Sequence, residues 1–157
     1  KDLYKYEHFG ALKALEYQRD LERLAFTAGG RQQSAPAQRL TDFVEGKLSA
    51  SLNETSYQPG LKSSPMHSLL PKIIGGSLRK GFKAFGEKMR GYYTEEANII
   101  GVESRTSSPV NIPRTESLEH PEISNLYPCG EGGGYAGGIV SAAMDGERCA
   151  EAATSAL

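Results

Sequence analysis

Six of the nine residues in the segment 130–138, here called the glycine loop, are glycine. The loop follows the short apolar run 126–129 and opens onto the helix-like run 139–157. Glycines let the backbone come close to a ligand, while the first turn of a helix offers unpaired N–H groups and a partial positive charge. The sequence therefore predicts a ligand seat for a phosphate, a ribityl chain or an electron-rich ring oxygen. A tight strand-to-helix turn is the alternative, although it would need only one or two glycines.

The spacing of Gly132, Gly134 and Gly137 matches G-x-G-x-x-G, a motif of dinucleotide-binding domains. The full fingerprint also needs a second parallel strand and an acidic residue about 20 positions later, which holds a ribose. The residues after Gly137 are too few to form them. We therefore expect the closing strand, loop and helix of such a domain, whose opening unit lies elsewhere.

Polar side chains follow two of the expected strands. Glu131 lies at the tip of the strand before the glycine loop, where ligands gather in open α/β sheets. Its carboxylate can accept hydrogen bonds from sugar-like hydroxyls. Arg105, Thr106 and Ser107 end another expected strand and are rich in hydrogen-bond donors. A solvent-facing acid and a polar turn before Pro109 are the respective alternatives.

Metal and nucleophile chemistry find no support in the sequence. His8, His67 and His120 have no histidine or cysteine at metal-ligand spacing, so we expect no metal site. No nucleophile motif such as G-x-S-x-G is present, and the catalytic residues stay unassigned. Cys129 and Cys149 form neither a CxxC motif nor a disulfide framework, which favours a reducing, cytoplasmic setting.

Bulk composition argues against nucleic-acid and membrane partners. The formal net charge of the 157 residues is −1, so no overall field attracts nucleic acid or acidic lipid. No apolar run approaches the roughly 20 residues that a membrane span needs. The basic residues of the segment 71–92 share a helical pattern with an apolar stripe, which is typical of a half-buried helix with a solvated face. Docking of a partner on that basic face is the alternative.

Apolar residues recur at helical spacing in three parts of the chain. The expected helices cover residues 12–28, 36–45 and 71–92. Gly29-Gly30 supplies a left-handed stop to the first helix, and Gly46 ends the second. Pro36 suits the first turn of the second helix.

A change of period near residue 97 predicts that strands follow the helices. The expected extended segments are 97–106, 110–113 and 126–129. These segments are too few to form a sheet that buries both faces, so we expect them to complete a sheet built by other segments. The fold class is therefore α+β: a mostly helical module is followed by the closing strand, glycine loop and helix of an incomplete α/β domain.

Two long segments carry a family resemblance. Residues 101–114 and 126–146 closely resemble the C-terminal part of a bacterial family of predicted FAD-dependent dehydrogenases. The segment Pro-Ala-Gln-Arg at 36–39, with Asp42 and Phe43, is similar to the substrate-side domain of that family. The resemblance covers nearly the whole chain and implies a glutathione-reductase-like FAD fold.

The resemblance also implies a division of the chain and its partners. Residues 1–96 would be the helical part of the inserted substrate-side domain, and residues 97–157 the returning strands and last helix of the FAD-binding domain. The ADP half of FAD would lie on an N-terminal Rossmann segment that is missing here. The implied partners are that missing portion of the same polypeptide and a small-molecule substrate.

By the same resemblance, the acid after the returning strand binds the ribityl or phosphate part of FAD. The following helix points its N-terminus toward the flavin pyrimidine, and the polar segment before Pro109 approaches the isoalloxazine or the substrate. The residues expected to bind the cofactor are Gly130, Glu131, Gly132, Gly133, Gly134, Tyr135, Ala136, Gly137, Gly138, Ile139, Arg105, Thr106 and Ser107.

We therefore expect a C-terminal fragment of an FAD-dependent oxidoreductase, in which the flavin performs hydride or electron transfer. The isolated fragment would be inactive, would bind FAD weakly or not at all, and would self-associate through exposed surfaces. The alternative is a non-enzymatic helical interaction module with a structural glycine loop. A phosphate-binding module for another nucleotide is a third interpretation.

Overall fold

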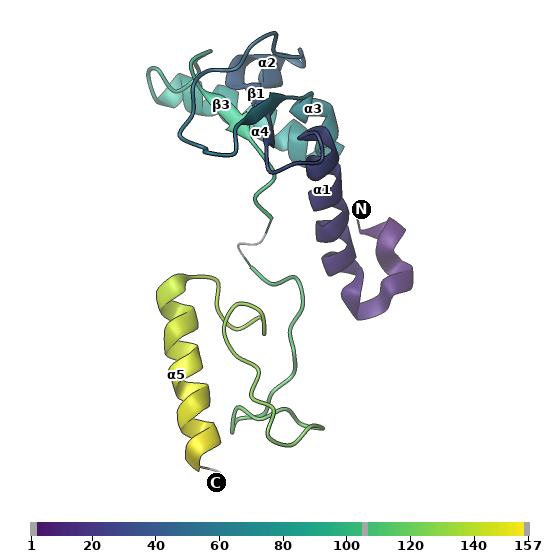
Figure 1. Cartoon of the computed structure of the whole chain (residues 1–157), viewed down its shortest axis with the longest axis vertical. Helices are drawn as coiled ribbons and strands as arrows, with labels where there is room; N and C mark the ends of the chain where they lie inside the picture. Colours follow the sequence, from purple (N-terminus) through teal and green to yellow (C-terminus); the bar gives the residue numbers. More distant parts are fainter. Residues whose placement is uncertain (1–2, 105–106, 156–157) are drawn as a thin grey trace. The chain divides into compact units, whose positions relative to one another are not determined.

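The computed structural model describes residues 3–104 and 107–155 (Figure 1). The described residues divide into two compact units. The helical unit is Arg19–Val102, and the loop unit combines Leu3–Gln18 with Glu103–Leu157. The elements in chain order are the 3-10 helix η1 (Tyr4–Leu12), α1 (Lys13–Ala28), β1 (Ala35–Arg39), α2 (Leu40–Glu45), β2 (Leu61–Ser63), α3 (Met66–Leu69), α4 (Lys72–Lys88), β3 (Asn98–Ile100) and α5 (Ile139–Ser155). Helices with a small mixed sheet confirm the α+β class.

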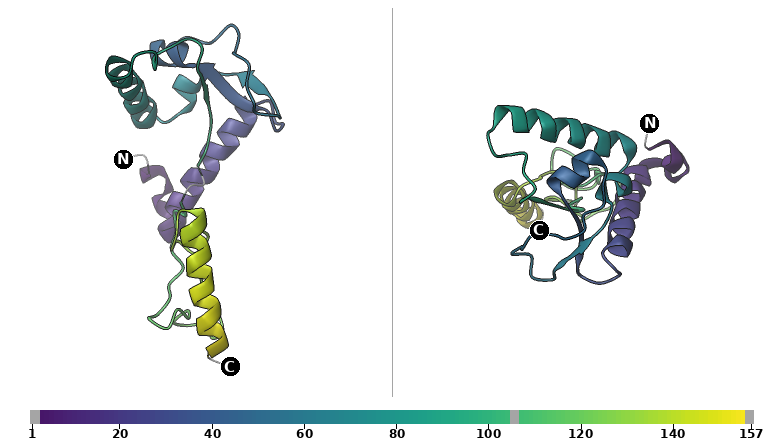
Figure 2. Two further views of the ribbon diagram at one scale, coloured as in Figure 1. Left: turned by 90° about the vertical axis from the view of Figure 1, so that its left-hand side faces the viewer. Right: turned by 90° about the horizontal axis from the view of Figure 1, so that it is seen from above.

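Three short strands and three helices build the core of the helical unit. β1 lies in the middle of the sheet, parallel to β2 and antiparallel to β3. Leu40, Phe43 and Val44 of α2 and Met66 of α3 form the buried cluster, and Phe82 of α4 packs against it. Figure 2 shows α2 and α4 next to each other within this unit. Burial of these apolar side chains is what stabilises the helical unit.

The predicted helix over residues 36–45 is wrong in its first half. β1 takes that half, and α2 begins only at Leu40. The carbonyls of Pro36 and Ala37 accept hydrogen bonds of 3.2 and 2.9 Å from the segments that follow β3 and β2. Proline disfavours helix at the residue before it, and a strand between two partners satisfies its backbone groups on both sides. The helical spacing of the apolar residues therefore holds only from Leu40 onward.

Two glycines end helices as predicted. Gly30 and Gly46 have φ values of 92° and 76°, in the left-handed region. After Gly30, the N–H of Arg31 donates to the carbonyl of Phe26 at 2.9 Å, and the corresponding bond after Gly46 measures 2.8 Å. Each bond satisfies a carbonyl that the helix end would leave unpaired, which is the Schellman arrangement.

The position of α4 matches its prediction, but its burial does not. The helix begins after Pro71 and ends at Lys88, before its predicted end. Phe82 packs against the core, whereas Leu78 and Phe85 are 37% and 46% exposed. The apolar stripe is buried along only part of its length because α2, which α4 contacts, has 6 residues against the 17 of α4.

In the loop unit, α5 begins where the sequence predicts a helix. The predicted strands at 110–113 and 126–129 are wrong, since the described residues after β3 contain no strand. A strand forms against a partner that pairs several consecutive backbone groups. Here the backbone makes single bonds between loops instead, such as the one from Ile112 N–H to the Gly133 carbonyl at 3.1 Å. Within the described part of the predicted strand 97–106, which excludes residues 105 and 106, only the three residues of β3 are in a strand.

Within residues 3–104 and 107–155, no helix combines the length and the apolar character that crossing a membrane demands. The same ranges contain no group of three His, Cys, Asp or Glu side chains that could hold a metal ion.

Replacing Phe43 with Ala should lower the free energy of unfolding by about 3–5 kcal/mol, because the ring is fully buried and its removal leaves a cavity. Phe85→Ala on α4 is the matched control: its side chain is half exposed, so the loss should be about 1 kcal/mol or less. Urea denaturation followed by circular dichroism measures both variants. Equal losses would contradict the assigned core.

Candidate functional site

The glycine loop turns sharply at two left-handed glycines. Gly130 and Gly134 have φ values of 65° and 85°. Within the turn, Tyr135 N–H donates to the Gly130 carbonyl at 3.0 Å, and Gly134 N–H donates to the Glu131 carbonyl at 2.9 Å. A Cβ on Gly134 would lie 2.5 Å from the carbonyl oxygen of Val110. The fold of the loop unit therefore requires glycine at 134 on two counts.

Gly132 differs from these two positions. Its φ is not positive, and a Cβ built on it would find no heavy atom of the described residues within 4 Å beyond its chain neighbours. The packing of the loop unit therefore gives no reason for a glycine at 132. Glycine at this position leaves the backbone of the loop uncovered on that side.

A buried ion pair fixes the glycine loop to α5. Arg114 donates from Nη2 to Asp145 Oδ1 at 2.7 Å and from Nη1 to Oδ2 at 2.9 Å. The same carboxylate accepts a bond of 2.9 Å from Gly130 N–H, and Nη1 also donates to the carbonyl of Pro128 at 2.9 Å. The Arg114 and Asp145 side chains are only 10% and 9% exposed. These four residues are called the Arg114–Asp145 clamp below.

The clamp shifts the ionisation of both its charged groups. The hydrogen bond from Arg114, followed by that from Gly130 N–H, lowers the pKa of Asp145 from 3.8 to about 2, against the effect of burial. The hydrogen bond to Asp145 in turn raises the pKa of Arg114. Because the folded pKa of Asp145 is below its unfolded value, its contribution to stability is complete above about pH 5 and is lost as the pH falls through about 2.

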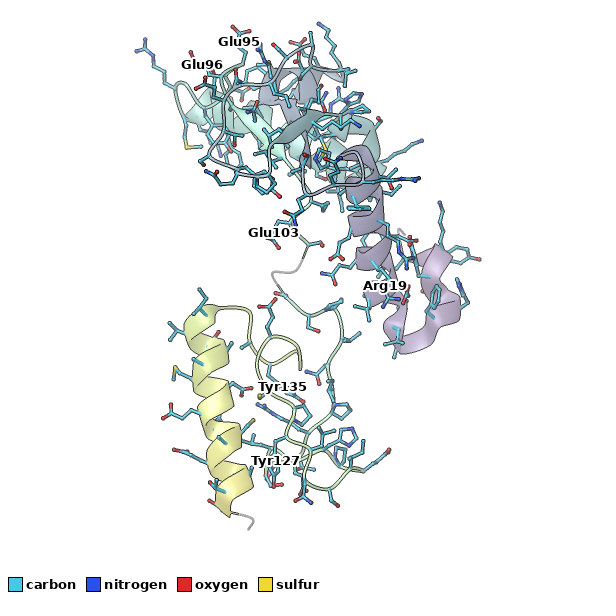
Figure 3. All side chains as sticks on the ribbon, viewed as in Figure 1. Arg19, Glu95, Glu96, Glu103, Tyr127 and Tyr135 are labelled. Carbon is cyan, nitrogen blue, oxygen red and sulfur yellow. The ribbon has the colours of Figure 1, made fainter. Side chains whose placement is uncertain are left out.

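Tyr135 covers the guanidinium of the clamp. The Arg114 Cζ lies 3.6 Å from the centroid of the Tyr135 ring, which is a cation–π contact. The Tyr135 hydroxyl donates to the carbonyl of Ile112 at 2.7 Å. Figure 3 shows this ring among the loop segments beside α5. Tyr135 thus ties the segment that precedes Arg114 to the glycine loop.

The last glycine of the loop leads directly into α5. Gly138 N–H donates to Ser141 Oγ at 3.2 Å, and the same hydroxyl donates to the Gly138 carbonyl at 3.0 Å. The first turn of a helix leaves further N–H groups unpaired and carries a partial positive charge. Ile139 and Val140, at this turn, are 92% and 72% exposed. The start of α5 is therefore accessible to a ligand, and its apolar side chains are exposed to solvent.

A hollow of about 350 Å³ lies beside the loop within the same unit. Its wall includes the segment 107–110 and the tip of the glycine loop. The lining residues are Leu15, Gln18, Ser107, Ser108, Pro109, Val110, Glu131 and Gly132. Among the described residues, the Glu131 carboxylate has no hydrogen-bond or ion-pair partner, so it is available to a ligand in the hollow.

Comparison with known proteins identifies the family. The model of the family "FAD-dependent protein, C-terminal domain-like" matches residues 2–106. The chain belongs to this family. The match covers the whole helical unit. The glycine loop lies after the matched residues.

A relative extends the similarity through the glycine loop. The chain is 42% identical over 142 residues to an uncharacterized protein of Clostridium beijerinckii. The aligned stretch covers 89% of this chain. A continuous stretch of that length includes the glycine loop wherever in the chain it begins. It covers 27% of the relative, so the chain spans about a quarter of that protein's length.

The structure brings several of the predicted site residues of this family member together. Those that line the hollow are Ser107, Glu131 and Gly132. Those that form the turns of the loop and bond it to the segment around Ile112 are Gly130, Gly133, Gly134 and Tyr135. Those that lead into α5 are Ala136, Gly137, Gly138 and Ile139. Arg105 and Thr106 lie outside the described residues.

The position of the loop depends on Arg114 and Asp145, and neither residue is among those predicted from the sequence. Asp145 did leave a signal, because it shares a helix face with Cys149, four positions later, in a run otherwise rich in alanine. A charged residue on a face that must be buried needs a partner of opposite charge. Arg114, isolated after Pro113 in a loop, gave no signal of its own.

Acid should weaken the loop unit through Asp145. Between about pH 5 and pH 2, protonation of this carboxylate should remove about 2 kcal/mol from the free energy of unfolding, given its pKa of about 2. An Asp145→Asn variant lacks this contribution, so its urea unfolding should depend less steeply on pH. Glu122→Gln, at an exposed position, is the control and should keep the wild-type slope.

A carbon NMR titration of the wild-type Asp145 carboxyl group tests the same point without a variant. A midpoint near 4, or equal pH slopes in wild type and Asp145→Asn, would contradict the role given to the clamp.

Proposed function

We propose that this chain contributes the ribityl and isoalloxazine side of an FAD site, and part of the substrate domain, to an FAD-dependent oxidoreductase. Membership of a family of FAD-dependent proteins supports a flavoprotein. The observation that carries the proposal is Gly132, a glycine that the fold does not need, placed next to Glu131 on the wall of a hollow. In this proposal residues 1–96 belong to the substrate-side module and residues 97–157 to the FAD-binding domain.

The glycine loop supplies backbone and a carboxylate. With Gly132 open on its Cβ side, a cofactor chain can lie against the backbone there. The unpartnered carboxylate of Glu131 would accept hydrogen bonds from ribityl hydroxyls. Ser107 would face them across the hollow, while the Ser108 hydroxyl is already engaged with the Val110 carbonyl at 2.7 Å. Donors and acceptors of this kind fit a polyhydroxyl chain better than an apolar ligand.

The start of α5 supplies electrostatics. Its unpaired N–H groups and partial positive charge would favour negative charge on the pyrimidine side of the flavin ring. When bound, the flavin itself supplies the hydride or electron transfer. The chain's own residues hold and orient the cofactor: Gly130, Glu131 and the rest of the glycine loop as the seat, and Gly138 and Ile139 as the helix start.

The proposal leaves the adenosine half of FAD to other parts of the full-length protein. The chain spans 27% of its Clostridium relative, and the missing portion would carry the Rossmann segment. Without it, we expect the isolated chain to hold flavin weakly or not at all and to be inactive.

Gly132→Ala separates a ligand role from a structural one. Because the added methyl group meets no described atom within 4 Å, the free energy of unfolding should change by less than about 1 kcal/mol. In the full-length protein, flavin occupancy after purification should nevertheless fall several-fold. Gly134→Ala is the control: its Cβ would collide with the Val110 carbonyl, so stability should fall as well. A Gly132→Ala protein that keeps its full flavin content would refute the seat.

Glu131→Ala in the full-length protein should weaken FAD retention, since ribityl hydroxyls would lose a charged acceptor worth about 1.5–3 kcal/mol, or roughly ten- to a hundredfold in affinity. The control is Glu122→Ala, which removes an exposed carboxylate away from the hollow. Flavin absorbance per protein and the FAD dissociation constant are the measurements. Equal retention in both variants would remove Glu131 from the site.

A non-enzymatic interaction module is the alternative, and one observation favours it. Arg79, Lys80 and Lys83 of α4 surround a hollow of about 260 Å³ in the helical unit. Arg79 is fixed there, since its Nε–H donates to the carbonyl of Val44 at 2.7 Å. No acidic side chain pairs with these three cations among the described residues, so an anionic partner would fit. Full-length protein without flavin would favour this alternative.

A further inference from the structure

Two cysteines that the proposed function does not use lie on adjacent segments of the loop unit. Cys129 precedes the glycine loop and is exposed, whereas Cys149 on α5 is buried. The sulfur of Cys149 lies 3.8 Å from the carbonyl oxygen of Pro128, the residue directly before Cys129. Arg114 Nη1 approaches the same sulfur to 3.4 Å. The backbone at Cys129 therefore rests against Cys149, although 20 positions separate the two cysteines in the sequence.

The Arg114–Asp145 clamp holds this arrangement in register. Asp145 lies four positions before Cys149, so the two side chains share one face of α5. Asp145 accepts a hydrogen bond from the residue after Cys129, and Cys149 contacts the residue before it. Cys129 is thus pinned between two contacts with the same helix face.

Burial makes the Cys149 thiol less reactive toward molecules in solvent. It is the largest cause of the raised pKa of this thiol. A buried thiol of raised pKa is a poor nucleophile toward molecules in solvent. A reaction partner for Cys149 must therefore be held beside it by the fold, and the backbone contacts on either side of Cys129 place this residue next to the same helix face.

We propose that Cys129 and Cys149 form a reversible thiol-oxidation site that closes to a disulfide when it meets a small disulfide such as oxidised glutathione. The exposed Cys129 thiolate attacks one sulfur of oxidised glutathione, and the first glutathione leaves with the proton that Cys129 lost. The Cys149 sulfur then attacks Cys129 Sγ and releases the second glutathione, which takes the proton of Cys149. Two protein thiols become one disulfide, and one oxidised glutathione becomes two thiols.

The closed bond has a defined effect on the candidate site. It links the residue before the glycine loop covalently to α5, where only hydrogen bonds and the ion pair act in the reduced protein. Reduced glutathione in excess reverses the reaction by the same two exchanges, so the site responds to the thiol–disulfide balance around it.

Tryptic mapping of the full-length protein tests the site directly. Cleavage after Arg148 separates the peptide 115–148, which carries Cys129, from the peptide that begins at Cys149. After exposure to oxidised glutathione, these two peptides should be recovered mainly as one cross-linked species, two hydrogens lighter than their sum. Dithiothreitol should separate them again. In a Cys149→Ala variant the reaction should stop at a stable glutathione adduct on Cys129.

Two results would overturn the proposal. One is a wild-type protein that accumulates the glutathione adduct on Cys129 without a cross-link, which would mean that Cys149 cannot reach it. The other is a wild-type protein in which neither cysteine reacts. Both readouts come from the wild-type chain, so they do not depend on whether a cysteine variant folds.

Discussion

The loop unit depends on the contact between Arg114 and Asp145. Among the described residues, the buried apolar side chains belong mostly to the helical unit, and those in the loop unit are Pro128 and Cys149. Apolar burial therefore contributes little to holding the glycine loop, the segment before Arg114 and α5 together. A carboxylate that accepts two guanidinium bonds and one backbone bond holds them together instead. Breaking such a buried pair from one side typically costs about 3–5 kcal/mol, because the other charge stays buried without a partner.

This constraint explains why the glycine loop can be both glycine-rich and fixed. Glycines raise the conformational entropy of the unfolded chain, so a loop with many of them is costly to order. The clamp ties the loop at Gly130, and the hydroxyl of Tyr135 ties it again from the other end. The stretch between these two anchors includes Glu131 and Gly132, which face the hollow. A seat ordered before its ligand arrives does not lose binding free energy to ordering afterwards.

Local signals in the sequence predicted the parts of the fold that local interactions decide. Gly30 and Gly46 end their helices because a left-handed residue is favourable at that point whatever surrounds it. The first half of the segment 36–45 forms β1 instead of the predicted helix, because the partners of β1 lie more than 20 residues away in the chain, where periodicity does not reach. The apolar spacing that signals α2 is real, but tertiary pairing decided where the helix begins.

The candidate site divides in the same way. The glycine loop and Glu131 could be found from composition and spacing, and the structure places Glu131 with Ser107 around one hollow. The clamp could not be found in this way, because Arg114 and Asp145 are 31 positions apart and Arg114 lies in a loop without a period. Residues that position a site through long-range contacts leave little trace in a single sequence. The residues proposed to meet the ligand are marked by unusual local composition.

The exposed side chains at the start of α5 connect the electrostatics of the site to its surroundings. Ile139, Val140 and Met144 are all more than half exposed, and they flank the helix end that would face a cofactor. A helix N-terminus in open water favours negative charge by only about 0.3–1 kcal/mol, because solvent screens its partial charge. Covering these apolar side chains would exclude water from the same turn and lower the local dielectric constant, so each free N–H would act more strongly on a nearby anion. In the proposed site, burial of this surface would therefore strengthen the effect of α5 on negative charge at the end of the glycine loop.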